Sequence, residues 1–219
     1  MNRRDFSTRL VGTGLGAAAA SLFATGAHAQ AGAPAEGKHF TRVEPPVPPV
    51  VPGKLEVLEF FSYACPHCNS FEPTIAAWSK SLPADVAFHR VPVPFLANFE
   101  NLMRTYYSLE TLGQVDAMQR KVFAAIHVER NYLDKPADIA ALMAKNGLDA
   151  AKFTAVFNSF SVATSVARAK KLMAAYKLDG VPTLAVQGRY LTSPGQAGGL
   201  EQATAVADYL LQRARTTKS

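Results

Sequence analysis

The spacing of apolar positions changes several times along this 219-residue chain, and each change marks an expected element. A near-continuous apolar run over 55–61 predicts a buried strand, as in sheets that are covered on both faces. From Pro66 to Lys80 apolar residues recur every three to four positions, which predicts a helix with Pro66 in its first turn. A second strand is expected over 86–93, where prolines end it.

The second half of the chain continues this alternation after a long helical block. Between 97 and 176 the apolar spacing is helical throughout. Strand spacing returns over 183–187, and a turn at Gly188 predicts a hairpin with 189–191. A last amphipathic helix is expected over 200–214. The order predicts an α/β fold, in which a strand–helix core is divided by a helical insertion.

The N-terminus has the three parts of a secretory signal. Arg3 and Arg4 precede an uncharged stretch rich in Ala, Gly and Leu, and Ala27-His28-Ala29 is a small-x-small cleavage site. We therefore predict a signal peptide over 1–29 and a mature chain that begins at Gln30. A membrane anchor is the alternative, but glycines dilute the apolar run. The paired arginines also resemble a twin-arginine signal, which leaves the export route open.

A tail and a stiff connector are expected over 30–53. Residues 39–43 alternate like a short edge strand. Five prolines within 44–53 disfavour sheet interior and favour an extended spacer, with a proline-recognition motif as the less common alternative. The expected division is a signal peptide (1–29), a tail and connector (30–53), a core (54–96 and 177–215) and a helical insertion (97–176).

Composition narrows the class of protein. Hydrophobic residues make up 48% and charged residues 18%, which indicates a globular chain with a substantial core. The net charge of +6 is spread thinly, so no nucleic-acid footprint is indicated. Only two cysteines are present, which excludes a multi-disulfide scaffold. After the leader no apolar run is long enough to span a bilayer, and a bacterial export signal predicts a soluble periplasmic protein in an oxidising compartment.

The candidate chemistry lies at Cys65-Pro66-His67-Cys68. Two cysteines separated by two residues, at the start of a helix directly after a strand, form a redox arrangement. The unpaired N–H groups and partial positive charge of the helix N-terminus stabilise a thiolate at Cys65, so its pKa should be lowered. His67 adds to this effect, and Cys68, one turn deeper, would resolve a mixed disulfide.

Three other interpretations of the cysteines are less favourable. A structural disulfide across so small a loop stabilises little. A zinc site needs four ligands, which His67 and His89 do not complete. Two inert thiols this close would oxidise after export. His89 and His127 are interpreted as ordinary histidines, because neither has a partner in the sequence.

The segment 58–68, Leu-Glu-Phe-Phe-Ser-Tyr-Ala-Cys-Pro-His-Cys, resembles the active-site segment of the DsbA family. These are bacterial periplasmic thiol:disulfide oxidoreductases with a thioredoxin fold. Gly180-Val181-Pro182-Thr183 looks like the cis-proline loop of this family, and Asn158-Ser159-Phe160 is similar as well. The resemblance covers 37–211 and implies a thioredoxin fold with an inserted helical domain. The long Pro-rich segment and the Thr after the proline depart from the pattern.

The resemblance implies a role for each residue of the motif. Cys65 would be the exposed nucleophile that receives electrons from substrate thiols, and Cys68 its buried partner. Pro66 and His67 would set how oxidising the pair is.

The resemblance also reaches residues outside the motif. Val181 would offer main-chain hydrogen bonds to a bound peptide, and Pro182 in cis would remove a clash beside the sulfurs. Glu59 interrupts an otherwise apolar strand, so we expect a buried acid that assists proton transfer at Cys68. Arg90 on the next strand is its expected partner.

The function that this implies is donation of the Cys65–Cys68 disulfide to newly exported proteins with free cysteines. The protein is expected to be a monomer that needs no metal or organic cofactor. A DsbB-type membrane partner would reoxidise it and pass the electrons to quinone. The alternatives are a disulfide isomerase or reductase of the same fold, and a periplasmic chaperone whose thiols are vestigial.

Overall fold

The computed structural model describes residues 32–95 and 100–217 of the chain. The predicted signal peptide and the predicted mature N-terminus at Gln30 lie outside the described residues. Met1–Ala33 and Pro34–Ser219 form two separate units, and every described helix and strand belongs to the second.

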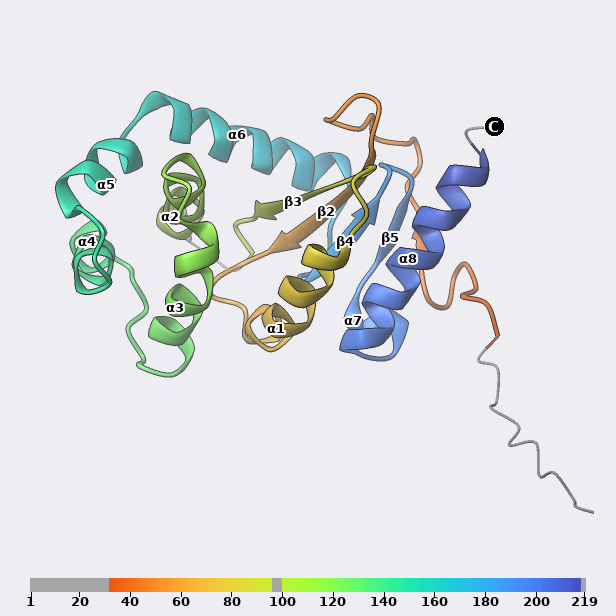
Figure 1. Cartoon of the computed structure of the whole chain (residues 1–219), viewed down its shortest axis with the longest axis horizontal. Coiled ribbons are helices and arrows are strands. Elements are labelled where there is room, and N and C mark those ends of the chain that lie inside the picture. Colours follow the sequence, from red (N-terminus) through yellow and green to blue (C-terminus); the bar gives the residue numbers. More distant parts are fainter. Residues whose placement is uncertain (1–31, 96–99, 218–219) are drawn as a thin grey trace, which may run out of the picture. The chain divides into compact units, whose positions relative to one another are not determined.

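A five-stranded mixed sheet lies at the centre of the second unit (Figure 1). β2 and β3 are parallel, whereas β1–β5, β5–β4 and β4–β2 are antiparallel. The order across the sheet is β1 (Thr41–Arg42), β5 (Tyr190–Thr192), β4 (Thr183–Val186), β2 (Leu55–Phe61) and β3 (Val86–Pro92). The strands predicted over 55–61, 86–93, 183–187 and 189–191 are confirmed to within two residues, and the edge strand is confirmed but shorter.

Helices cover both faces of this sheet, which explains the continuous apolar run of β2. Leu55 and Val57 pack with α1 (Pro66–Ser81) and α8 (Leu200–Thr217) in one hydrophobic cluster. Alternate residues of a strand point to opposite faces. Leu58 and Phe60 accordingly pack on the other face with residues of α6 (Phe160–Ala175).

The predicted helical insertion joins β3 to β4. It contains α2 (Glu100–Thr111), α3 (Val115–His127), α4 (Pro136–Lys145), α5 (Ala150–Phe157) and α6, which returns the chain toward the sheet (Figure 1). The helices α2 to α5 share a third cluster with Phe61, Tyr63 and Cys68. The end of β2 and the start of α1 therefore abut the insertion, while the exact domain boundaries stay a prediction.

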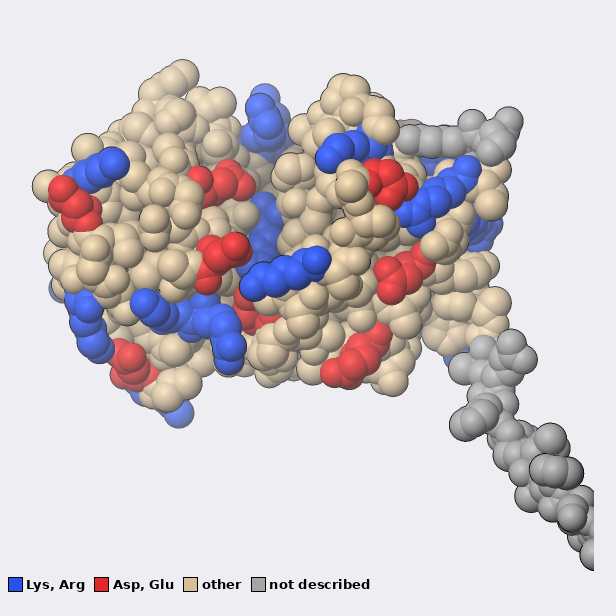
Figure 2. Space-filling model, viewed as in Figure 1, with Lys and Arg blue, Asp and Glu red and all other residues tan. Residues whose placement is uncertain are grey.

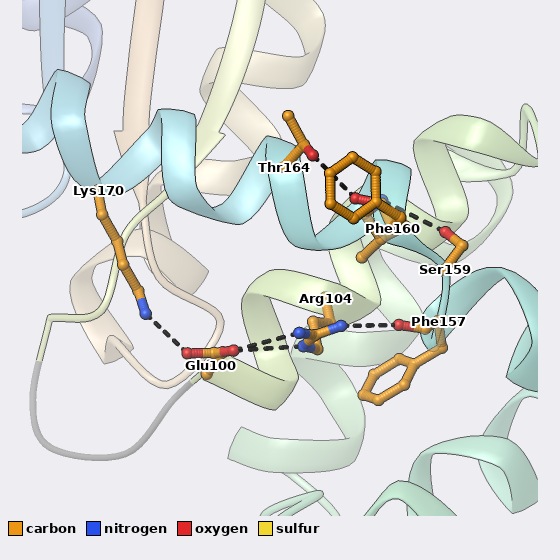
Figure 3. A network of polar contacts seen from close by, with 8 residues as sticks. Glu100, Arg104, Phe157, Ser159, Phe160, Thr164 and Lys170 are labelled. Atoms are coloured by element: carbon orange, nitrogen blue, oxygen red, sulfur yellow. Dashed lines mark hydrogen bonds and ion pairs between the residues drawn. The ribbon is translucent and has the colours of Figure 1, made fainter.

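A polar network on the surface of the insertion joins three of its helices (Figure 3). Lys170 of α6 lies 2.7 Å from Glu100 at the start of α2, and Arg104 lies 3.4 Å from the same carboxylate. Arg104 also donates to the carbonyl of Phe157, the last residue of α5, at 3.1 Å. The start of α2 is thereby held against α5 and α6.

Two further elements complete the comparison with the sequence. The helix α7 (Pro194–Ala197) is missing from the prediction, because four residues are too few to give a periodic pattern. The connector over 44–53 contains no strand or helix, as predicted.

On the face seen in Figure 2, basic and acidic side chains are interspersed. Within the described part of the chain, no helix has both the length and the apolar character that crossing a membrane requires.

Candidate active site

The two cysteines lie where β2 turns into α1. Cys65 is the N-cap residue of the helix and Pro66 occupies its first turn, as predicted. A hydrogen bond of 3.1 Å from the Cys65 amide to the carbonyl of Ser62 closes the turn that precedes the helix. Both cysteines are free thiols in this structure.

The surroundings of Cys65 favour its thiolate. A hydrogen bond from the Cys68 thiol is the largest cause, and together with the amides of Cys68 and His67 it lowers the pKa of Cys65 to about 5 against the effect of burial. The charge of His67 adds a smaller contribution. These amides belong to the first turn of α1, so the helix N-terminus acts on the sulfur as predicted.

The prediction of an exposed nucleophile is wrong in one respect. Cys65 is only 4% exposed, whereas Pro66 and His67 beside it are exposed. The loop before β4 covers the sulfur, because the Cys65 thiol donates to the carbonyl of Val181 at 3.5 Å. The peptide bond between Val181 and Pro182 is cis, as the resemblance implied.

Cys68 is the buried member of the pair, with no exposed surface. Burial raises the pKa of the Cys68 thiol, and so do its hydrogen bond to Cys65 and the negative charge of Glu59. One sulfur therefore favours the thiolate and the other retains its proton. This asymmetry is what a pair with one attacking and one resolving sulfur requires.

Glu59 is buried, 1% exposed, and its partner is Arg90. The two residues are register neighbours on the parallel strands β2 and β3, and Nε of Arg90 donates to Oε2 of Glu59 at 2.9 Å. Burial raises the pKa of Glu59 to about 7, although Arg90 opposes this rise. The predicted buried acid and its predicted partner are thus both confirmed as a pair.

A second buried acid, Glu72, shares the same arginine and is not predicted from the sequence. Glu72 is 3% exposed, and Nη2 of Arg90 donates to its Oε1 at 3.2 Å. Burial raises the pKa of Glu72 too, with Arg90 and Gln119 opposing this effect. The available signal was its position four residues after Cys68, on the helix face that carries the buried Phe71 and Ile75.

Helix α3 contributes residues that the sequence pattern did not reveal. His127, interpreted as ordinary, forms a 2.8 Å hydrogen bond between its Nε2 and the carbonyl of Tyr63. Gln119 accepts a 2.5 Å hydrogen bond from the hydroxyl of Tyr63. These contacts join residues 64 and 56 positions apart in the sequence, so local spacing carries no sign of them.

No metal centre is evident in the described ranges 32–95 and 100–217. Within them no three His, Cys, Asp or Glu side chains lie close enough together to hold a metal ion. His89, which the sequence offers as a second histidine ligand, is exposed on β3.

Comparison with known proteins agrees with the geometry. Residues 78–210 match the family described as DSBA-like thioredoxin domain. The matched segment begins after the cysteine motif, so it supports the assignment independently of that motif.

Relatives and solved structures extend the similarity to nearly the whole chain. The Thiol:disulfide interchange protein DsbA of Pseudomonas aeruginosa is 43% identical over 198 residues, which cover 90% of this chain and 93% of that protein. The protein of the same name from Bordetella pertussis is 43% identical over 98% of this chain and all of its own length. A crystal structure of Pseudomonas aeruginosa DsbA has a TM-score of 0.81 at 41% identity, covering 84% of this chain and 96% of that chain. The chain therefore belongs to the DsbA family and is a thiol:disulfide oxidoreductase with a thioredoxin fold and inserted helices.

Proposed function

We propose that this protein works as an oxidase, which donates a Cys65–Cys68 disulfide to newly exported proteins with free cysteines. The observation that carries the proposal is the opposite treatment of the two sulfurs. A thiolate at Cys65 is favoured by the Cys68 thiol and by two helix amides, which stabilises the reduced form of the pair. A pair whose reduced form is stabilised accepts electrons readily and is therefore oxidising.

The reaction begins with a substrate thiolate that attacks the sulfur of Cys65. The Cys65–Cys68 bond breaks, and its electron pair moves to Cys68, which takes up a proton from Glu59. A mixed disulfide now joins substrate and Cys65. A second substrate thiolate attacks the substrate sulfur, and Cys65 leaves as its low-pKa thiolate. The substrate has lost two electrons and gained a disulfide, and the protein holds the two electrons as a reduced pair.

The residues around the sulfurs have separate roles in this proposal. Pro66 and His67 set how oxidising the pair is, and both are exposed beside Cys65. Val181 offers main-chain groups to an extended substrate segment next to the sulfur. Pro182 in cis removes a clash beside the sulfurs. No metal or organic cofactor takes part.

The cellular setting follows from the same proposal. The leader over 1–29 directs export, and the mature protein acts in the periplasm as a monomer. A DsbB-type membrane protein takes up the two electrons and passes them to quinone. Mass spectrometry of the periplasmic protein checks the predicted N-terminus, and a leader retained on the released protein would contradict it.

A reduced dithiol peptide provides the direct test. The wild type in its disulfide form should oxidise it, and Cys65→Ser should be inactive. Cys68→Ser, treated instead with a peptide whose single cysteine is activated as a mixed disulfide with a good leaving thiol, should release that thiol and retain the peptide on Cys65. The chain has no third cysteine, so a trapped adduct can only form at that sulfur. Faster reduction of insulin than oxidation of the peptide would favour the reductase or isomerase alternative. Suppression of aggregation that survives Cys65→Ser would favour a chaperone.

A further inference from the structure

One face of α3 holds Tyr63, two residues before the nucleophilic cysteine. Gln119 accepts from its hydroxyl at 2.5 Å, Phe123 packs edge-on against its ring at 5.0 Å, and His127 bonds to its carbonyl at 2.8 Å. The three residues are four positions apart, so they form one stripe along the helix. The insertion thus holds the turn between β2 and α1 at its backbone, ring and hydroxyl.

The side-chain amide of Gln119 has a second hydrogen-bonding atom, its Nε2 donor. The residue is 2% exposed, and within the described ranges its buried Nε2 has no well-aligned hydrogen bond. Oε2 of Glu72 is likewise buried without a well-aligned hydrogen bond, although Arg90 lies 3.2 Å away. The nearby side-chain amide of Gln119 lowers the pKa of Glu72, and so favours its charged carboxylate, against the larger effect of burial. A buried amide donor beside a buried carboxylate acceptor is stabilising only when the two are paired, directly or through one water.

Two acids compete for one base at this place. Arg90 donates to Glu59 at 2.9 Å and to Glu72 at 3.2 Å. Two buried carboxylates that share one guanidinium carry one uncompensated charge, so one of them readily holds a proton. A hydrogen bond donated to Glu72 alone therefore favours a charged Glu72 and leaves the proton on Glu59.

We propose that Gln119 is a positioning residue of the redox site, which fixes the Tyr63 turn and keeps Glu72 charged, so that the exchangeable proton resides on Glu59. The inference deepens the proposed oxidase function and rests on it. No hydrogen bond joins Gln119 to either cysteine in the part of the chain that the structure describes, and it acts through Tyr63 and through the two acids.

Other charged and titratable groups face the acid pair from each neighbouring element. Arg90 approaches from β3, and Arg120 of α3 favours the charged form of Glu72. Cys68 of α1 senses the charge of Glu59, and Tyr106 of α2 acts on Arg90. Gln119 is neutral, so its replacement by an apolar side chain leaves these charges in place and removes only the amide.

The test is an NMR titration of the glutamate carboxyl carbons in oxidised protein, together with peptide-oxidation kinetics. In Gln119→Met, the midpoint of Glu72 should rise by about one pH unit, the size of one lost hydrogen bond to a charged group, and that of Glu59 should fall. The maximal rate should fall several-fold while KM for the peptide stays unchanged. Lys121→Met, on the exposed side of the same helix, should match the wild type in every readout.

Tyr63→Phe provides a second route if Gln119→Met folds poorly. Loss of the hydroxyl removes the hydrogen bond that orients the Gln119 amide toward Glu72. The titration midpoint of Glu72 should therefore rise and that of Glu59 should fall, each by less than in Gln119→Met. Glutamate midpoints that superimpose on the wild type in the folded variants would overturn the inference. That outcome leaves the oxidase proposal intact when the wild type oxidises the peptide, whereas an inactive wild type would contradict the oxidase proposal alone.

Discussion

The strand β2 carries two glutamates, Glu56 and Glu59, that are equally buried at 1% exposure and have very different surroundings. Glu56 points to the α6 face, where its Oε2 accepts from the amides of Val50 and Val51 at 2.7 and 3.2 Å. Glu59 points to the α1 face, where it shares Arg90 with Glu72. Their separation by three residues places them on opposite faces of the sheet.

The contrast shows that burial alone does not make an acid part of the chemistry. Glu56 accepts hydrogen bonds from backbone amides of the Pro-rich connector, which do not release their protons near neutral pH, so it anchors that segment. Glu59 binds Arg90, which it shares with Glu72, and its charge acts on Cys68, the sulfur that must gain and lose a proton. The partners of a buried acid, and not its depth, separate the structural role of Glu56 from the proton-transfer role that we propose for Glu59.

The largest effect is expected from Glu59→Gln in oxidised protein. A pKa raised from 4.5 to about 7 leaves folding stability intact below pH 4.5 and lowers it as pH rises through 7. The wild type should therefore lose about 3 kcal/mol of unfolding free energy between pH 4 and pH 8, and the variant should lose much less. Urea unfolding at several pH values measures this, and parallel pH profiles of the two proteins would contradict it. Peptide oxidation by the variant should also be slower, because Cys68 loses its proton partner.

The second prediction is a difference in unfolding free energy between the reduced and the oxidised protein. A pKa of about 5 for Cys65 stabilises the reduced protein fully above the pKa of the unfolded thiol, and this stability is lost as pH falls through 5. At pH 7 the reduced form should unfold with about 2 kcal/mol more free energy than the oxidised form, after allowance for solvent screening. Thermal unfolding of both forms across pH checks this.

The same measurement sharpens the contrast between the two glutamates. Glu59→Gln should change the difference between the redox states, because the charge of Glu59 acts on Cys68. His67→Ala should shrink that difference slightly. Equal melting temperatures of the reduced and oxidised wild type at pH 7 would count against the thiolate.

The third prediction concerns Glu56→Gln, the same substitution on the same strand. An amide oxygen accepts more weakly than a carboxylate, so two hydrogen bonds to the connector are weakened and stability should fall by about 1–2 kcal/mol. This change in unfolding free energy is opposite in sign to that of Glu59→Gln, which should raise the unfolding free energy at pH 8. The loss should be equal in both redox states, and peptide oxidation should be unchanged. A redox-dependent loss would mean that Glu56 communicates with the sulfurs after all.

The sequence predicts elements with a clear period and misses contacts between distant segments. The β2 run, the Pro66 start of α1 and the helical insertion each have a local pattern, and all of them are found. Glu59 is predicted from the sequence as the exception in the β2 run, whereas Glu56, which interrupts the same run, is not. Alternation fixes the face of a residue in a strand, but a folded-back connector that binds Glu56 has no local signal.

The site shows the same limit. The cysteine motif and the position of its helix predict the chemistry, and the family resemblance supplies Pro182 and the acid–base pair of β2 and β3. The exposure expected for Cys65 fails because Val181, distant in sequence, covers the sulfur. Gln119 and His127 belong to the site only through the packing of α3 against Tyr63, so their amphipathic stripe is indistinguishable from ordinary core in the sequence.

The smallest effect is expected at an exposed acid, Glu100, which completes the comparison (Figure 3). Lys170 lies 2.7 Å from its carboxylate, and the two side chains are 44% and 49% exposed. This hydrogen bond lowers the pKa of Glu100, whereas burial raises that of Glu59. Water screens such a pair and holding two long side chains costs entropy, so Lys170→Met should lower stability by less than about 1 kcal/mol.

Salt distinguishes the exposed pair from the buried one. Raising the ionic strength should reduce the small effect of Lys170→Met toward zero, because exposed charges are screened, while the effect of Glu59→Gln should persist. Urea unfolding at low and high salt makes the comparison, with peptide oxidation as a check that the sulfurs are unaffected. A loss of several kcal/mol that resists salt would show that the network of Glu100, Arg104 and Lys170 holds the insertion together. In that case, exposure would be as poor a guide to the importance of an acid as burial is on β2.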